Sequence, residues 1–358
     1  MKISFAAIGL LCILCAAVLS SGSAAAATLG GVNLTTSPVA TSITGKPGST
    51  TTTTLQVENN ESFAVTINVE LETFQAYGSS GAAQMVPFSK DDPSSSWVHL
   101  SANSFVAQPG VWNSIKMTID LPSNAGLGYY YAVIFKPQIN TVAQKLGSTI
   151  KGGNAILVLV NALSNNESPQ IAVTNFSADK KLYEYLPATF NVTIKNTGNI
   201  FLAPTGDIYI SKSSNFTNSI DTIPVNATGG NVLADTSRVF TQQWVDGFPV
   251  YAPKTIDGQK ITNKKGQVEQ VLKWNFSNAN RIRFGKYYAK LVLVYSNGSR
   301  DVPIVATVSF WVIPWKILSI VLAVIILTLV GLYVSGHKLA ARTFRLSKKV
   351  KNHKQSDA

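Results

Sequence analysis

An uninterrupted apolar stretch near the C-terminus constrains this chain more than any other feature. It runs from Ile317 to Val334 and contains no charged residue. As a helix it would be about 27 Å long, close to the thickness of about 30 Å of a bilayer's hydrocarbon core. Trp311 and Trp315 stand just before it, where indole rings favour the membrane interface. The sequence therefore predicts a transmembrane helix at residues 312–335, with a buried core helix as the alternative.

Basic residues in the segment after this helix indicate its orientation. Residues 336–358 contain seven Lys or Arg residues, among them Lys338, Arg342 and Arg345, and a single acid. Such clusters stay on the cytoplasmic side of a membrane, so we expect a cytoplasmic tail and an ectodomain outside the cell. These three cations, with the two tryptophans, are the expected membrane-anchor residues. The net charge of +12 then indicates contact with anionic lipid rather than with nucleic acid.

The N-terminus has the three parts of a secretory signal peptide. A positive start is followed by the apolar run Ile3–Leu19 and by a stretch of small residues. This order predicts that residues 1–27 are a cleaved signal peptide, with an uncleaved anchor helix as the alternative. Both cysteines of the chain, Cys12 and Cys15, fall inside it. The mature chain would then have no disulfide, which in an exported protein indicates a prokaryotic surface.

The expected ectodomain, residues 28–311, has the pattern of many short β-strands. Apolar and polar residues alternate in several runs, which places the apolar side chains of each run on one face. The clearest runs are residues 52–58, 65–71, 114–120 and 190–195. The length suits two domains rather than one. We predict an all-β ectodomain of two tandem Ig-like β-sandwiches, at residues 28–165 and 166–311, followed by the single C-terminal transmembrane helix.

A faint internal repeat supports two sandwiches of similar design. In each half a strand ends in an asparagine, at Asn59 and at Asn196, and a Ser-Asn-Ala turn follows later. The motif Gly-x-Tyr-Tyr-Ala then opens another strand, at residues 128–132 and 285–289. A tyrosine at such a strand start can fasten the preceding loop through its hydroxyl, as in Ig-like sandwiches. We expect this contact in both halves.

The order of turns and strands in the first half resembles the extracellular domain of bacterial WxL-interacting cell-surface proteins. The resemblance rests on Ser37-Pro38, Pro47-Gly48, a strand ending at Asn59, Pro109-Gly110, a strand closing on Leu121-Pro122, and Gly128-Tyr129. That family has a signal peptide, two β-sandwich domains, one C-terminal helix and a basic tail. The resemblance implies binding to peptidoglycan or another cell-wall polymer and to surface proteins. The second half departs from the family's usual partner domain, which leaves the partner open.

Catalytic and metal-binding groups are scarce in the expected ectodomain. It contains one histidine, His99, and no cysteine, too few for a zinc site, and a Ser-His-Asp triad would depend on that single base. No Gly-rich phosphate loop is present. We predict no enzyme activity, no metal and no cofactor. A wall hydrolase that uses Asp91 and Asp92 as paired carboxylates is the enzymatic alternative.

The segment from Gln75 to Ser96 is the longest stretch without a strand pattern, and we expect a long loop there. It contains Tyr77, Asp91 and Asp92, and Trp97 follows it. Long loops on β-sandwiches often carry binding residues, so these four are the candidate binding residues. The alternatives are a solvated turn for the two acids and core packing for the tryptophan.

The sequence as a whole therefore predicts a single-pass protein of the cell membrane with its ectodomain outside the cell. Its expected function is binding of a cell-wall polymer or of surface proteins through the β-sandwich domains. The alternative is an accessory subunit of a membrane complex, docked through its helix and basic tail.

Overall fold

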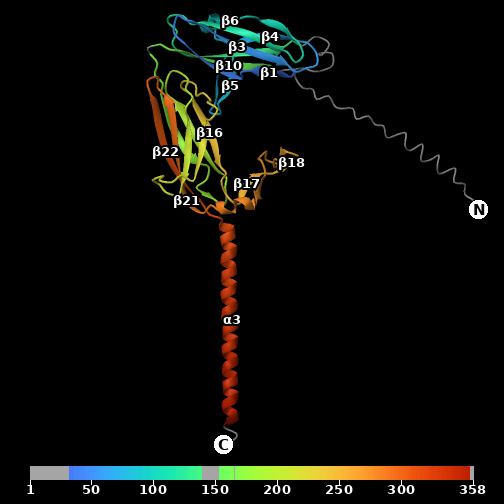
Figure 1. The fold of residues 1–358 in the computed structure, drawn as a ribbon, viewed down its shortest axis with the longest axis vertical. Helices are drawn as coiled ribbons and strands as arrows, with labels where there is room; N and C mark the ends of the chain where they lie inside the picture. Colours follow the sequence, from blue (N-terminus) through green and yellow to red (C-terminus); the bar gives the residue numbers. More distant parts are fainter. Residues whose placement is uncertain (1–31, 139–152, 165, 355–358) are drawn as a thin grey trace, which may run out of the picture.

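The computed structural model describes residues 32–138, 153–164 and 166–354, and its side chains as far as Lys338. Figure 1 shows two β-sandwiches, one above the other, and a long helix that runs from the lower end of the second. The expected all-β fold of two tandem Ig-like sandwiches with one C-terminal apolar helix is confirmed. The predicted signal peptide lies outside the described residues.

Two sheets form the first sandwich. One has the strand order β1-β3-β8-β6, and the other has the order β2-β10-β9-β4-β5, with β7 also paired to β4. The strands are β1 (Leu34–Ser37), β2 (Ala40–Gly45), β3 (Thr50–Asn59), β4 (Val65–Tyr77), β5 (Ala82–Val86), β6 (Val98–Leu100), β7 (Ser104–Ala107), β8 (Trp112–Asp120), β9 (Leu127–Pro137) and β10 (Asn154–Ala162). All neighbours are antiparallel except β2, which runs parallel to β10.

Alternation of apolar and polar residues determines which side chains enter the first core. Leu55 and Val57 of β3 have no exposed surface, and neither have Met117 and Ile119 of β8. The residues between them face outward. Each fully buried side chain of this kind stabilises the fold by about 1.5–3 kcal/mol relative to an exposed one. The strands predicted from these two alternating runs are therefore confirmed.

The second sandwich also has two main sheets, β11-β13-β16 and β12-β22-β21-β14-β15, and two small hairpins, β17-β20 and β18-β19. The strands are β11 (Ile171–Ala178), β12 (Leu182–Tyr183), β13 (Ala188–Asn196), β14 (Thr205–Ser211), β15 (Asp221–Val225), β16 (Ser237–Trp244), β17 (Val250–Pro253), β18 (Thr255–Ile256), β19 (Gln259–Lys260), β20 (Gln270–Lys273), β21 (Gly285–Ser296) and β22 (Asp301–Val312). A short 3₁₀ helix, η2 (Phe276–Arg281), precedes β21.

Aromatic rings fill the second core. Trp244 has no exposed surface, and its ring centroid lies 5.1 Å from Tyr287 and 6.0 Å from Phe310. Phe190 meets Phe310 edge to face at 5.5 Å. Tilted and edge-to-face pairs of this kind add about 0.5–1.5 kcal/mol each beyond the burial of their area. The end of β16, which carries Trp244, is therefore firmly fixed.

The internal repeat is visible in the contacts of two fully buried asparagines. In Asn59 the side-chain amide donates to the carbonyls of Phe63 and Ala107, and its oxygen accepts from the Glu61 amide. In Asn196 the amide donates to the carbonyls of Ile200 and of Val232, which lies in the connection before β16, and its oxygen accepts from the Gly198 amide. The same side chain thus organises the same turn in both sandwiches.

The expected tyrosine contact is present in both halves. The hydroxyl of Tyr129 accepts a hydrogen bond from the Gly126 amide at 3.2 Å, and the hydroxyl of Tyr287 accepts one from the Phe284 amide at 3.2 Å. Each bond spans three residues backward, so each tyrosine fastens the loop before its own strand. Tyr129 is the second residue of its Gly-x-Tyr-Tyr-Ala motif and Tyr287 is the third residue of its own, so the two tyrosines occupy motif positions that differ by one.

The predicted loop from Gln75 to Ser96 is wrong, because most of this segment is regular. Strand β4 continues to Tyr77 and pairs with β5, and a 3₁₀ helix, η1 (Pro93–Trp97), follows. Gly78 and Gly81 in the connecting turn have positive φ angles, which glycine adopts without strain. The glycine- and serine-rich composition that suggested a loop therefore belongs to the tight turn of a hairpin.

The helix α3 (Trp315–Lys354) follows β22 almost directly. Its first part, Trp315–Lys338, is long and apolar enough to cross a membrane, and all of its residues are exposed. Two backbone hydrogen bonds hold the preceding strand end, from Trp311 to the Lys181 carbonyl and from Ile313 to the Tyr183 carbonyl. The entry to the helix is therefore fastened to the second sandwich.

Candidate binding cleft between the two sandwiches

The β4–β5 hairpin brings the first sandwich onto the second. Its turn reaches β16, where the Ser79 carbonyl accepts a hydrogen bond of 2.8 Å from the Val239 amide. Figure 1 shows β5 next to β16 at the junction. This contact joins the edge of one sandwich to the backbone of the other.

A small apolar cluster strengthens the junction. Phe74, Ile134 and Leu159 of the first sandwich pack with Phe201 and Leu233 of the second, and all five are buried. Burial of such side chains contributes about 25 cal/mol for each Å² of apolar surface removed from water.

Tyr130 of β9 adds a polar contact at the same place. Its hydroxyl accepts a hydrogen bond of 3.1 Å from the Ala234 amide, and its ring lies 5.7 Å from Phe74 and 6.4 Å from Phe201. Burial raises the pKa of this hydroxyl above its usual value. The two sandwiches are thus joined by apolar and polar contacts together.

Beside this cluster lies a cleft of about 560 Å³. The outer face of the first sandwich's sheet forms its floor with Phe74, Leu157 and Leu159, and residues 228–238 of the second sandwich form the opposite wall. Asn231 in that wall donates to the Ser42 hydroxyl across the cleft at 3.1 Å. The cleft therefore combines an apolar floor with a few polar groups, the usual make-up of a ligand site.

Arg238 is the one charged residue among those that line the cleft. Its guanidinium donates to the Asn231 carbonyl at 2.8 Å and stacks over Phe240 at 4.9 Å. Gly81 and Gly230 lie against it, and a Cβ added at Gly81 would fall 2.2 Å from its Nε atom. The absence of a side chain at these glycines leaves the space that the guanidinium occupies.

In the described part of the chain, the Arg238 guanidinium forms no ion pair with a carboxylate. Burial lowers the pKa of the guanidinium, but an arginine remains protonated at neutral pH. A half-buried cation without a counter-ion attracts an anion, and guanidinium binds carboxylates through paired hydrogen bonds. The cleft is therefore suited to a ligand with apolar groups and one anionic group.

The comparisons with known proteins assign no family to this chain. No family model matches the chain, and no curated protein matches it. Its fold is similar to the class 5 fimbriae chaperone CfaA, with 14% identity and a TM-score of 0.36 over 77% of this chain and 98% of that chain. The corresponding values for the E. coli chaperone DraB are 10%, 0.31, 77% and 99%.

A chain of a chaperone–tip adhesin complex of CFA/I fimbriae biogenesis is similar at 18% identity and a TM-score of 0.34, over 58% of this chain and 88% of that chain. Nothing about the ligands or the function of this chain follows from similarities of this size. The resemblance to WxL-interacting proteins stays a prediction.

The structure separates the four candidate binding residues. Tyr77 lies at the end of β4, opposite Ala82, which lines the cleft, and its side chain is 64% exposed. Asp91, Asp92 and Trp97 lie at η1, which leads into β6, and Figure 1 places β6 on the far side of the first sandwich from β5. These four residues therefore do not form one site.

The residues at η1 have local structural contacts. Asp92 caps the helix by accepting a hydrogen bond of 2.9 Å from the Ser94 amide, while Asp91 is exposed in the preceding turn. Trp97 packs edge to face on Tyr129 at 4.9 Å and borders the first core. In the described residues, no group of acids, histidines or cysteines has the arrangement of a metal site. Binding through these residues stays a prediction.

The five expected anchor residues follow one another from the end of β22 into α3. Trp311 is exposed at the end of β22, and Trp315 is exposed at the start of α3. Lys338 is the last residue of the apolar part of α3, and Arg342 and Arg345 follow it on the same helix. This order suits an interfacial tryptophan pair before the membrane and a cationic segment after it.

Proposed function

We propose that this protein is a membrane-anchored extracellular binding protein that holds a segment of a surface partner protein in the cleft between its sandwiches. The observation that carries the proposal is the half-buried charge of Arg238 above an apolar floor. The partner segment supplies apolar side chains for the floor and a carboxylate for the guanidinium. In this proposal α3 crosses the cell membrane, with the basic tail in the cytoplasm.

A protein segment suits the cleft better than a wall polymer does. Sugars need many hydrogen-bonding groups, whereas Phe74, Leu157 and Leu159 offer an apolar surface. The few polar groups present fix orientation, as they do in other apolar sites. A cell-wall polymer, as the resemblance implied, remains an outcome of the test.

The test places a photo-crosslinking residue at Val39, a cleft residue that is 73% exposed, in the full chain on cells. We expect a crosslinked surface protein that Arg238→Met greatly reduces, because losing a charged contact of this kind costs about 2–5 kcal/mol. Arg300→Met is the matched control, since Arg300 is exposed and lies outside the cleft. Equal crosslinking by the unsubstituted chain, the Arg238→Met variant and the Arg300→Met variant would show that the partner does not bind in the cleft.

Two further arms separate the other functions. Retention on purified wall sacculi that depends on Arg238 would indicate a polymer ligand instead of a protein. A chain truncated after Pro314 retains the full β22, so it should still bind the partner. Loss of binding on this truncation alone would favour the accessory-subunit function, in which the helix and tail dock a membrane complex.

A further inference from the structure

The segment Trp274–Phe284 exposes an unusual amount of apolar surface. Trp274, Phe276, Ile282 and Phe284 are 48%, 74%, 62% and 51% exposed, respectively. The segment contains two arginines and no acid. Large exposed side chains grouped in this way mark a contact surface rather than ordinary solvent exposure.

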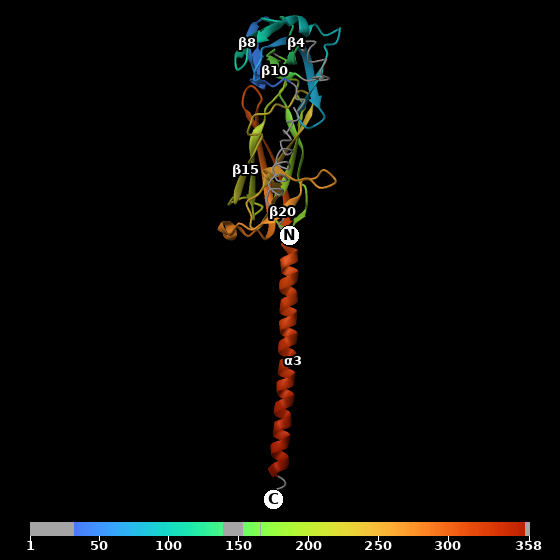
Figure 2. The ribbon, with the colours of Figure 1, turned by 90° about the vertical axis from the view of Figure 1, so that its right-hand side faces the viewer.

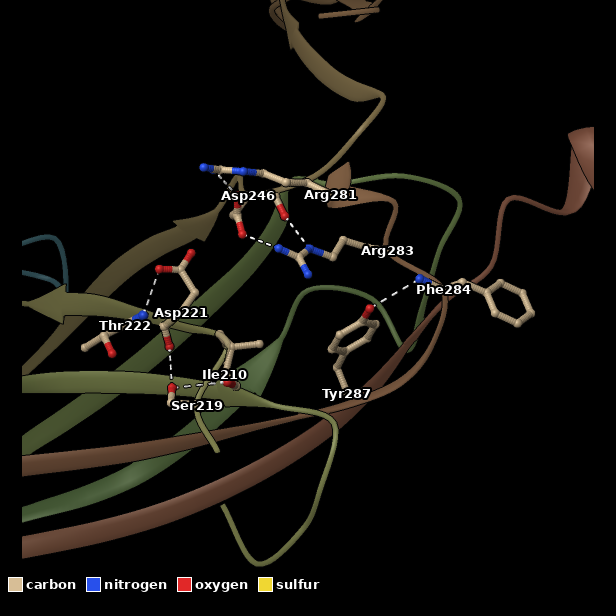
Figure 3. Close-up of polar contacts among 9 residues, drawn as sticks. All are labelled: Ile210, Ser219, Asp221, Thr222, Asp246, Arg281, Arg283, Phe284 and Tyr287. Atoms are coloured by element: carbon tan, nitrogen blue, oxygen red, sulfur yellow. Dashed lines mark hydrogen bonds and ion pairs between the residues drawn. The ribbon is translucent and has the colours of Figure 1, made fainter. Parts of the chain in front are cut away.

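Polar contacts fix this segment in its exposed position, as Figure 3 shows. Arg281 and Arg283 both form ion pairs with Asp246, and the Nε atom of Arg283 also donates to the Asp246 carbonyl at 2.7 Å. The Phe284 amide donates to the Tyr287 hydroxyl. These contacts hold the C-terminal end of the segment, and at its other end β20 is paired with β17 as far as Lys273.

The exposed rings form one group. Phe248 lies 5.6 Å from Trp274 and 5.4 Å from Phe276, and Trp274 stacks on Phe276 at 6.5 Å. The Phe248 amide also donates to the Arg281 carbonyl at 3.0 Å. The rings therefore present one continuous surface instead of separate exposed residues.

This surface lies at the end of the sandwich from which α3 leaves. Figures 1 and 2 both show η2 at the end of the second sandwich from which α3 leaves, and Figure 2 shows it to one side of the helix start. Tyr251 of β17 donates to the Glu184 carboxylate at 3.3 Å, and Lys316 of α3 binds the same carboxylate at 2.7 Å. A chain of contacts therefore connects the strand next to the ring group with the first turn of the helix.

The charge of the ectodomain is concentrated in the same region. Residues 245–285 contain seven Lys or Arg residues and three acids, whereas the rest of residues 28–315 balances fourteen cations with fourteen acids. Cations near a bilayer surface are attracted to anionic headgroups by about 1 kcal/mol each. Lys273, Arg281 and Arg283 lie directly before or within the segment Trp274–Phe284, so positive charge and apolar rings occur together there.

We propose that Trp274–Phe284 is a second membrane contact, which seats its rings in the outer leaflet around α3 and holds the second sandwich against the bilayer. Amphipathic rings prefer the headgroup level, and interfacial segments bind through buried apolar area together with basic residues. The occupant of this surface is the lipid bilayer that α3 enters. The inference rests on α3 crossing a membrane, as in the proposed function, and is independent of the cleft.

The test uses the full chain in vesicles of mixed zwitterionic and anionic phospholipid, with a polarity-sensitive dye on a single introduced cysteine. The predicted mature chain has no cysteine of its own, so the unsubstituted chain should take up no dye. Phe276→Cys probes the surface, and Phe63→Cys, at a position that is 56% exposed in the first sandwich, is the matched control. Trp315→Cys at the start of α3 is the reference for the membrane interface.

We expect the dye at position 276 to shift its emission to the blue, and a lipid nitroxide near the headgroup to quench it as strongly as the dye at position 315. The dye at position 63 should show neither effect. Quenching at position 315 without quenching at position 276 would overturn the proposal and leave the anchor intact. The absence of quenching at both positions would overturn the membrane anchor as well, while partner crosslinking in the cleft would still be measurable.

Discussion

Replacing Asn196 by alanine should destabilise the second sandwich by about 2–6 kcal/mol. The side-chain amide donates to the carbonyls of Ile200 at 2.7 Å and Val232 at 2.9 Å, and the oxygen accepts from the Gly198 amide at 2.9 Å. The Val232 carbonyl also accepts from the Leu202 amide, and Gly198 also donates to another carbonyl. In the described residues the Ile200 carbonyl has no second donor.

The magnitude follows from these partners. A buried carbonyl without a donor costs about 1–3 kcal/mol, and each of the two remaining bonds contributes about 0.5–1.5 kcal/mol. Asn196→Asp keeps the shape but turns a donor toward two carbonyls into an anionic acceptor. We expect its penalty to be larger at neutral pH than in acid, because protonation restores one donor.

The assay is urea unfolding of the ectodomain truncated after Pro314. Asn175→Ala is the matched control, since that exposed amide donates only to the nearby Ser177 hydroxyl, and exposed substitutions usually stay within about 0.5 kcal/mol. If Asn196→Ala lowers the free energy of unfolding no more than Asn175→Ala does, the assignment of this side chain as the organiser of the turn is refuted.

Three other predictions concern stability and topology. Tyr287→Phe removes the hydroxyl that fastens the loop before β21 and should lower the free energy of unfolding by about 1 kcal/mol in the same urea assay, and an unchanged value would contradict it. Burial raises the pKa of Tyr131 and Tyr287 above the value near 10 of an unfolded chain. The folded state then keeps protons that the unfolded state releases, so urea titrations should show stability falling above pH about 10, by about 1.4 kcal/mol per pH unit for each tyrosine. A free energy of unfolding that does not change above pH about 10 would contradict the raised pKa of these tyrosines. Protease added to intact cells should digest the sandwiches and spare the tail after Lys338, and a tail cut from outside would reverse the proposed orientation.

The fold was predictable from the sequence because its strands are half-buried. An alternating run such as 114–120 has one face in the core, so the pattern alone identifies β8. The hairpin β4–β5 was missed because its residues 82–86, Ala-Ala-Gln-Met-Val, do not alternate, and β5 lies at a sheet edge where one face contacts the second sandwich. The tyrosine contact was expected correctly, but its register depends on the loop before the strand, which composition does not determine.

The cleft could not be predicted from the sequence. Arg238 lies near the start of β16, and nothing in its sequence neighbours distinguishes it from a solvated arginine. Its special position depends on Gly81, which is far away in sequence and reaches it only when the hairpin docks on β16. Contacts between domains are set by the packing of finished sandwiches, and local patterns carry no information about them. The domain limits and the candidate binding residues stay predictions.

The connection between β22 and α3 has a mechanical consequence. β22 is paired with β21 along twelve residues, and at its lower end β12 is paired with its other side. A pull on α3 away from the second sandwich acts along β22, so it slides this strand lengthwise against its neighbours. The hydrogen bonds between the strands then share the load and must break together, whereas a pull across the strands would open them one at a time. A protein built in this way resists tension between its sandwiches and its C-terminal helix.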